Sequence, residues 1–222
     1  MTNINDIKNF IEFVVNKVQS GNSVTVDQFN LSCDRAQMTI FELDYDKWTV
    51  TENASDFILS FVKQTDLVVD TTGHAPYPSD YLHGMDIKYY YVRNNGQGIY
   101  VPVKESVQKD WGEVEASLLL MPNKRFPKYA EYSDSIQFLP RSLGIVKFSY
   151  FSRPIKPIWA YANVNNRPVY DPVNSIQFQE SEYSMNRIIP EILSYFGVNL
   201  KDSQLAQFSE MFKQENSEQN VV

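Results

Sequence analysis

The chain has 222 residues, of which 43% are hydrophobic and 21% are charged; these proportions exclude global disorder and favour one packed core, or one core with an insertion. Its net charge of −7 argues against a nucleic-acid-binding protein, because duplex binding needs clustered cations. One cysteine excludes an intrachain disulfide, and with neither a signal-peptide pattern nor a long apolar run we expect a reducing compartment and no membrane segment.

Two amphipathic helices are expected at the N-terminus. Residues 5–19 place apolar side chains on one helical stripe. A second helix is predicted to start at Thr25, where Gln28 completes a capping box, and to run to about Trp48 with Cys33 on its apolar face. Because the connection is short, we expect the two helices to pack antiparallel as a helical hairpin.

A third helix is predicted over 53–65, followed by a short strand at 67–69. Residues 74–81 contain two prolines, which favour extended conformations and remove backbone donors, so this segment is expected to be rich in turns.

The hydrophobic period then changes from helical spacing to two. Residues 86–93 and 98–104 flank an Asn-Asn-Gly-Gln turn and predict a β-hairpin. One helix is expected within 105–120 and ends before Pro122. Strands are predicted at 134–139 and 144–152, and a second hairpin at 158–171.

The C-terminal part returns to helical spacing. A helix is predicted over 180–196, with Pro190 kinking or splitting it and Gly197 closing it. A last helix is expected at 202–214, and residues 217–222 are expected to form a disordered tail.

These elements predict an α+β fold in which N- and C-terminal helices form a bundle with a β-rich central insertion. The expected bounds are 1–66 plus 180–216 for the bundle and 67–179 for the insertion. Charge follows a similar division. Residues 1–75 carry 11 acids and 5 bases (net −6), 76–175 carry 9 and 12 (net +3), and 176–222 carry 7 and 3 (net −4).

The sequence offers no pattern typical of catalysis or metal binding. His74 and His83 are expected to be solvated loop residues, because a metal site needs more ligands at regular spacing. Cys33 is interpreted as an inert core thiol, and acidic pairs such as Asp44 and Asp46 as solvated side chains. We therefore expect no cofactor, no metal and no enzymatic activity.

Two groups of side chains are candidate interface or DNA-contact residues. Lys124, Arg125 and Lys128 alternate with aromatic residues, which suits contact with passing DNA or an acidic neighbouring subunit; a solvated loop is the alternative. Trp159 and Tyr161 form an aromatic group near a predicted strand edge, where they belong either to the core or to a partner anchor.

The order of several segments resembles a class of structural proteins from crAss-like and related short-tailed phages of Bacteroidetes hosts. The resemblance is carried by INDIKNFIEFVVNK and TVDQFNLSCDRAQMTIFE, by YPSDYLHGMDIKYYYV and KRFPKYAEYSDSIQFLP, and by FSYFSRPIKPIW, ANVNNRPVYDP and QESEYSMNRIIPEILSYFGVNL. It covers most of the chain as a pattern, and the stretch 105–121 departs from it.

This resemblance implies a head-to-tail connector or adaptor that forms a ring below a dodecameric portal and bridges the capsid vertex to the tail. It implies a homo-oligomeric ring, expected to be a dodecamer, that contacts the portal protein and other tail or ring proteins. Assembly would take place in the host bacterial cytoplasm and the final location would be the virion. The resemblance supplies no catalytic residues.

The alternative function is a stand-alone β-rich module that binds carbohydrate or peptide, since surface Tyr and Trp suit stacking on sugars. An enzyme is the third and least supported hypothesis, because the sequence lacks a phosphate-binding loop and a nucleophile motif.

Overall fold

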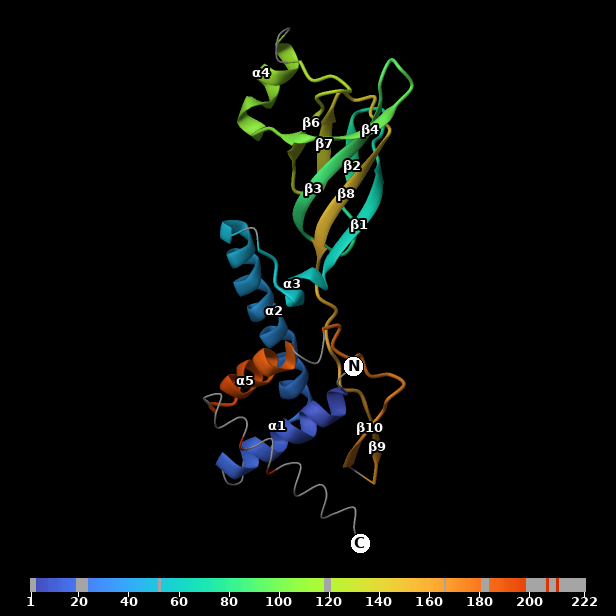
Figure 1. Cartoon of the computed structure of the whole chain (residues 1–222). Coiled ribbons are helices and arrows are strands. Elements are labelled where there is room, and N and C mark those ends of the chain that lie inside the picture. Colours follow the sequence, from blue (N-terminus) through green and yellow to red (C-terminus); the bar gives the residue numbers. More distant parts are fainter. Residues whose placement is uncertain are drawn as a thin grey trace. The chain divides into compact units, whose positions relative to one another are not determined.

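The computed structural model describes residues 3–18, 24–51, 53–117, 121–165, 167–180 and 184–198, together with Gln207 and Met211. The fold is mixed α+β, as predicted (Figure 1). The chain divides into two compact units, one made of residues 1–60 with 154–222 and the other of residues 61–153. We call them the terminal unit and the central unit.

The first part of the chain gives the terminal unit α-helices α1 (Ile4–Val18), α2 (Val26–Thr51) and α3 (Asp56–Leu59). The last part of the chain adds helix α5 (Met185–Tyr195). The predicted capping box at the start of α2 is confirmed: the Thr25 backbone N–H donates to Gln28 Oε1 at 3.2 Å, and the Gln28 N–H donates to Thr25 Oγ1 at 3.3 Å. Helix α2 extends beyond the predicted end at Trp48.

The predicted side-by-side hairpin of α1 and α2 is wrong. Helix α5 packs against both α2 and α1, and Figure 1 shows α1 crossing near the start of α2 instead of lying along it. The apolar side chains of α5, Ile188, Ile192 and Leu193, are fully buried. They pack against the apolar face of α2, where the sequence predicted that α1 would lie.

The third predicted helix is also mostly wrong. Helix α3 is a single turn that begins after Ser55, whose hydroxyl accepts from the Ile58 N–H at 3.3 Å. The chain then enters strand β1 (Val62–Val68), which pairs antiparallel with β8 (Ile145–Ser152). Long-range pairing of this segment with β8 overrides its local helical spacing.

Helix α5 is not split by Pro190. Its end is closed as predicted by Gly197, which has φ of +74°. The Val198 N–H donates to the Leu193 carbonyl and the Gly197 N–H to the Ser194 carbonyl, both at 3.0 Å, which is the Schellman arrangement. The predicted last helix and tail lie outside the described residues, apart from Gln207 and Met211.

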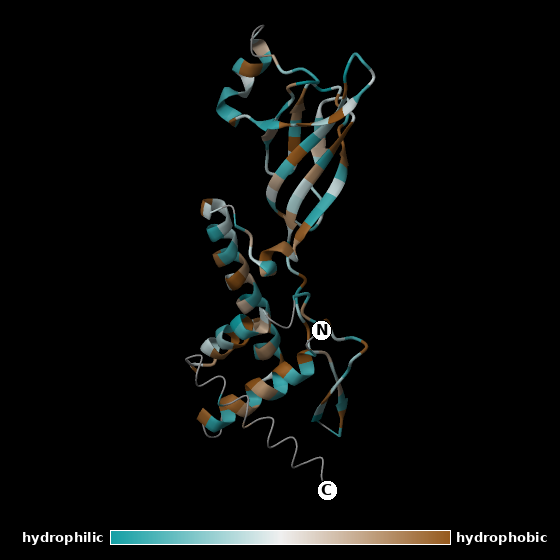
Figure 2. Ribbon diagram, in the orientation of Figure 1, coloured by the Kyte–Doolittle hydropathy of each residue, from teal (hydrophilic) through white to brown (hydrophobic). Residues whose placement is uncertain are grey.

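The central unit contains two four-stranded sheets that share one core. The first has the strand order β1-β8-β3-β4, with β3 at Tyr81–Val92 and β4 at Gly98–Pro102. The second has the order β2-β7-β6-β5, and its strands are β2 (His74–Pro76), β5 (Lys104–Glu105), β6 (Lys128–Glu131) and β7 (Ser135–Leu139). Buried side chains from both sheets meet in a single apolar cluster, including Ile87, Val146 and Phe148 from the first and Ala75, Ile136 and Phe138 from the second. In Figure 2 the strands of this unit carry alternating hydrophobic and hydrophilic colours, as expected for sheets with one buried face.

Within the central unit, the predicted hairpin is confirmed, with Val92 opposite Gly98 and Gly96 at φ of +81° in the turn. Two other predictions need correction. Residues 74–76 form β2 instead of a turn, because they pair with β7. The single helix expected within 105–120 is replaced by β5, a 3₁₀ turn η1 (Gln108–Asp110) and the short α4 (Trp111–Ala116); residues 118–120 lie outside the described residues.

The predicted second hairpin is confirmed in the terminal unit as β9 (Tyr161–Val164) and β10 (Arg167–Tyr170). Asn165 adopts φ of +52° at its tip. This hairpin is a separate two-stranded sheet, and all of its described residues are exposed except Tyr170, which is half-buried.

Candidate interaction surfaces

The three predicted cations lie in the loop that precedes β6 of the central unit and at the first residue of that strand. Asn123 organises the loop before β6: its side-chain oxygen accepts from the backbone N–H of Arg125 at 2.9 Å and of Phe126 at 3.1 Å. Lys124 and Arg125 are exposed, and Lys128 is half-buried on β6. We call residues 123–128 the basic loop.

Phe126 makes the basic loop apolar as well as cationic. Its side chain is 63% exposed, and the Arg125 guanidinium carbon lies 5.3 Å from the centre of its ring. A cation stacked on an exposed ring suits an acidic surface that also offers some apolar contact area. The role of the loop as an interface or DNA contact stays a prediction.

The structure places Trp159 in the interior of the terminal unit. It is 4% exposed, and its ring stacks against those of Tyr161 and Tyr170, with centroids 5.9 and 5.7 Å away. The Lys8 ammonium lies 4.5 Å from the centre of the Trp159 ring. Of the two predicted residues, Tyr161 is the one on the surface, at 44% exposure.

Hydrogen bonds fix Trp159 to both N-terminal helices. Its indole N–H donates to Asn5 Oδ1 at 3.0 Å, and its backbone N–H donates to Asn30 Oδ1 at 2.8 Å. The Asn30 amide returns a bond to the Trp159 carbonyl at 3.3 Å. Trp159 therefore anchors the start of the β9–β10 hairpin to α1 and α2. The two groups of predicted site residues belong to different units.

An aromatic pair on the solvent side of the first sheet was not predicted from the sequence. Tyr90 on β3 and Tyr100 on β4 are directly opposite, each is 51% exposed, and their ring centroids are 5.2 Å apart. Tyr90 also covers Gly98, where any side chain would collide with the Tyr90 ring. The period of two along each strand is the sequence signal that could have predicted the pair, because residues 88, 90 and 92 share one face of the sheet.

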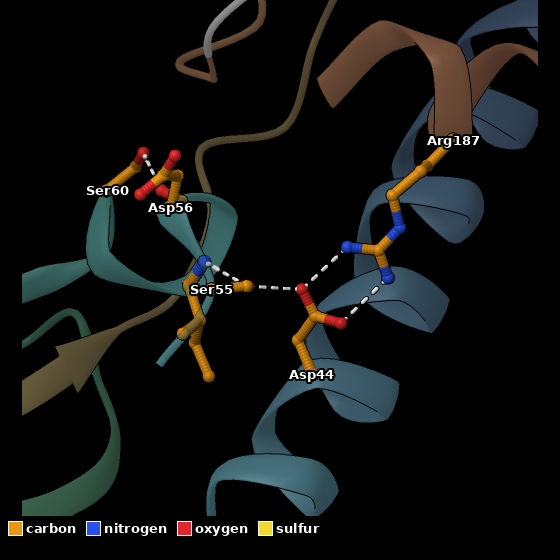
Figure 3. A network of polar contacts seen from close by, with 6 residues as sticks. Asp44, Ser55, Asp56, Ser60 and Arg187 are labelled. Carbon is orange, nitrogen blue, oxygen red and sulfur yellow. Dashed lines mark hydrogen bonds and ion pairs between the residues drawn. The ribbon is translucent and has the colours of Figure 1, made fainter. Parts of the chain in front are cut away.

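Asp44 is buried in an ion pair, which corrects its interpretation as a solvated acid (Figure 3). The Arg187 guanidinium donates two hydrogen bonds to its carboxylate, both at 2.7 Å, and the Ser55 hydroxyl donates a third. Burial opposes ionisation of Asp44, but the bonds from Arg187 and Ser55 outweigh it and lower the pKa. The network joins α2, α3 and α5, so we assign it to packing of the terminal unit.

Other candidate chemistry is absent from the described part of the chain. Cys33 is completely buried on α2, and burial, followed by the charge of Asp34, raises the pKa of its thiol. His74 and His83 are half-buried in β2 and β3, so their assignment to solvated loops is wrong. The described residues contain no group of three or more His, Cys, Asp or Glu side chains placed to hold a metal ion.

Nor does any helix within the described ranges have the length and apolar character needed to cross a membrane. Comparison of the sequence with models of known protein families found no match, and comparison with curated proteins found no match either.

Proposed function

We propose that this chain is a structural subunit of a phage virion, a portal–tail adaptor that assembles into a ring. The observation that carries the proposal is the unequal charge of the two units. The terminal unit has 17 acids and 9 bases (net −8), and the central unit has 10 acids and 11 bases (net +1). A ring is built from heterologous contacts, in which one surface of a subunit meets a different surface of the next, and charge segregated between units suits such contacts.

The proposed architecture is a bundle of N- and C-terminal helices with a β-rich insertion. The composition of the terminal unit supports it, because two distant parts of the chain pack together through α2 and α5. In the proposed ring the adjoining proteins are the portal and other tail or ring proteins. The basic loop, with Lys124, Arg125 and Lys128, faces an acidic neighbouring subunit or the DNA that passes through the channel.

The proposed role is structural and not enzymatic. Two buried groups that could support chemistry are engaged in packing: Asp44 is held by Arg187 and Ser55, and Cys33 is enclosed in the core. Within this proposal the chain works by binding its neighbours, after assembly in the host cytoplasm, and its final location is the virion.

Mass photometry and electron microscopy of the purified chain, with and without the portal protein, test the proposal. A discrete closed ring, either alone or on the portal, is the expected result. A chain that stays monomeric at all concentrations and never binds the portal would overturn it.

The Tyr90–Tyr100 pair favours one alternative, a module that binds carbohydrate or peptide. Exposed paired rings beside Lys147, whose ammonium lies 5.9 Å from the Tyr100 ring centre, are a suitable platform for stacking. A glycan array probed with the wild type and with Tyr100→Ala tests this alternative. Glycan binding that the substitution abolishes supports it, and no binding to any glycan counts against the carbohydrate form.

A further inference from the structure

The edges of the three sheets differ in how they are protected from pairing with another chain. An edge strand directs the N–H and C=O groups of alternate residues away from its sheet, where they can bind a further strand. A proline at such an outward position removes a donor and interrupts the edge. We call an edge open when its strand is longer than two residues, its outward positions lack proline, and their backbone groups bind nothing among the described residues.

In the first sheet, β4 is interrupted and β1 is open. The Val103 N–H donates to the Ile87 carbonyl at 2.8 Å, which fixes the ladder so that Pro102 points outward from β4. On β1, the Val69 N–H donates to the Gly144 carbonyl, so the even-numbered residues point outward. These outward residues are Val62, Gln64, Asp66 and Val68.

The second sheet has no open edge. On β2 the outward residues are His74 and Pro76. The His74 N–H donates to Asp70 Oδ1 at 2.9 Å, and its carbonyl accepts from the Asp70 N–H at 2.8 Å, so both of its outward groups are already occupied. At the other edge, β5 is only two residues long, which leaves little to pair with.

In the two-stranded sheet, β10 is interrupted and β9 is open. The Asp171 N–H donates to the Ala160 carbonyl at 2.9 Å, and the register then directs Pro168 outward from β10. On β9 the outward residues are Tyr161 and Asn163, whose backbone groups make no hydrogen bond to any described residue. A lone two-stranded hairpin is marginal in water and gains stability from another strand. Among the described strands, each unit therefore has one open edge.

We propose that β9 of one copy of this chain adds to the open edge of β1 in the next copy. The proposal rests on the ring proposed above and names the strands that make its contact. Charge favours this pairing, because β9 belongs to the unit of net −8 and β1 to the unit of net +1. Pairing β9 with β9 of a second copy would instead bring two strongly acidic units together.

The contact is heterologous, so it propagates from copy to copy, and it forms a ring when the rotation between successive copies closes. Main-chain hydrogen bonds at Tyr161 and Asn163 would supply the adhesion, as in other cases of strand addition. The hairpin would then add β9 and β10 beyond β1, extending the four-stranded sheet of the neighbour.

Disulfide cross-linking between single-cysteine variants tests this pairing. Residues opposite each other on adjacent strands have Cα atoms about 4.5–5.5 Å apart, within the range that a disulfide bridges. Asn163→Cys is mixed with Gln64→Cys, and separately with Asp66→Cys, and each mixture is oxidised and analysed by non-reducing gel and mass spectrometry. Because each variant carries only one of the two introduced cysteines, a cross-link between them can form only between chains. The native Cys33 is buried and remains in all variants.

The expected result is a cross-link from position 163 to position 64 or 66 in the mixtures and none in either variant alone. Tyr100→Cys, on the proline-interrupted β4 edge, is the matched control and should not react with Asn163→Cys. Cross-linking of Asn163→Cys with itself, or rings of wild-type size without any 163-to-β1 cross-link, overturns this pairing while leaving the ring intact. Failure of the wild type to form any ring, alone or on the portal, overturns the proposed function itself.

Discussion

The carboxylate of Asp44 accepts hydrogen bonds from residues 11 and 143 positions away, Ser55 and Arg187. Nothing in its local sequence distinguishes it from exposed Asp46 two residues later. Helical position is the one usable signal, since Asp44 continues the buried stripe of Phe29, Cys33 and Phe41. A partner so distant in the chain is set by tertiary packing, so the sequence alone assigned Asp44 to solvent.

We expect Asp44→Ala to destabilise the terminal unit by about 2 kcal/mol. This is less than the roughly 3–5 kcal/mol for breaking a fully buried pair, because Arg187 is partly exposed and regains water. Urea unfolding followed by circular dichroism measures the change. Asp46→Ala on the same helix is the control and should shift stability by no more than about 0.5 kcal/mol. Equal effects of the two substitutions would contradict the assigned role.

A second buried carboxyl, Glu180, has its pKa shifted in the opposite direction. Glu180 and Gln37 are both almost completely buried, and the Gln37 amide donates to Glu180 Oε1. The remaining oxygens, Glu180 Oε2 and Gln37 Oε1, have no partner among the described residues. Burial raises the pKa of Glu180 more than the bond from Gln37 lowers it.

The raised pKa of Glu180 predicts a loss of stability as the pH increases. The folded state holds the proton of this carboxyl more tightly than the unfolded state. The contribution is therefore complete below the ordinary pKa of about 4.3 and is lost as pH rises through the folded pKa. We expect Glu180→Gln, which keeps the shape and stays neutral, to remove this dependence and to equal or exceed the wild type at pH 8. Thermal unfolding of the wild type and the variant from pH 4 to 8 measures this pH dependence of stability. Parallel pH profiles of the wild type and the variant would contradict a raised pKa of Glu180 in the folded state.

At the scale of elements, the sequence predicted best where local chemistry decides the structure. The capping box of Thr25 and Gln28, the Asn-Gly turn before β4 and the Gly197 cap all use groups within a few residues of one another. Prediction failed for most of 53–65 and for 74–76, because residues 62–65 and 74–76 become strands only through pairing with β8 and β7, which lie more than 50 residues away.

The cap of α5 gives a prediction at this scale. Gly197→Ala should destabilise the terminal unit by about 1 kcal/mol, because φ of +74° brings an added Cβ against the following carbonyl. Gly112→Ala is the matched control: this residue lies inside α4, and an added Cβ meets no atom within 4 Å. Helix propensity predicts that the control gains about 0.5–1 kcal/mol. Chemical denaturation measures the free energy of unfolding, which should decrease for Gly197→Ala and increase for Gly112→Ala. A stabilised Gly197→Ala would contradict the assigned cap.

At the scale of the whole molecule, the unequal distribution of charge and the basic loop could be predicted from the sequence. Both depend only on composition and on which residues are neighbours along the chain. The Tyr90–Tyr100 pair and the distinction between open and interrupted edges were not predicted. Both depend on strand register, which is fixed by hydrogen bonds such as that from Val103 to Ile87. The burial of Trp159 likewise depends on Asn5 and Asn30, which are more than 100 residues away.

The basic loop predicts salt-dependent assembly. Replacing both Lys124 and Arg125 with Glu should weaken ring formation at low salt by about tenfold or more, and the difference from wild type should shrink above about 0.5 M salt, where charges are screened. Mass photometry across a salt series measures the fraction assembled. The control replaces Arg93 and Lys109, two exposed cations of the same unit, with Glu, which gives the same change in net charge. Equal loss in both variants would mean that total charge matters and the basic loop does not.

The central unit is attached through the ends of two neighbouring strands. Val62 at the start of β1 lies opposite Phe151 near the end of β8, and the Ser152 N–H donates to the Phe61 carbonyl at 2.8 Å. A domain whose two chain ends are adjacent can be replaced as a whole by recombination at two points in the gene. The replacement does not change the distance between the two points where the rest of the chain continues. Recombination at these two points would give related proteins new binding surfaces on an unchanged helical base.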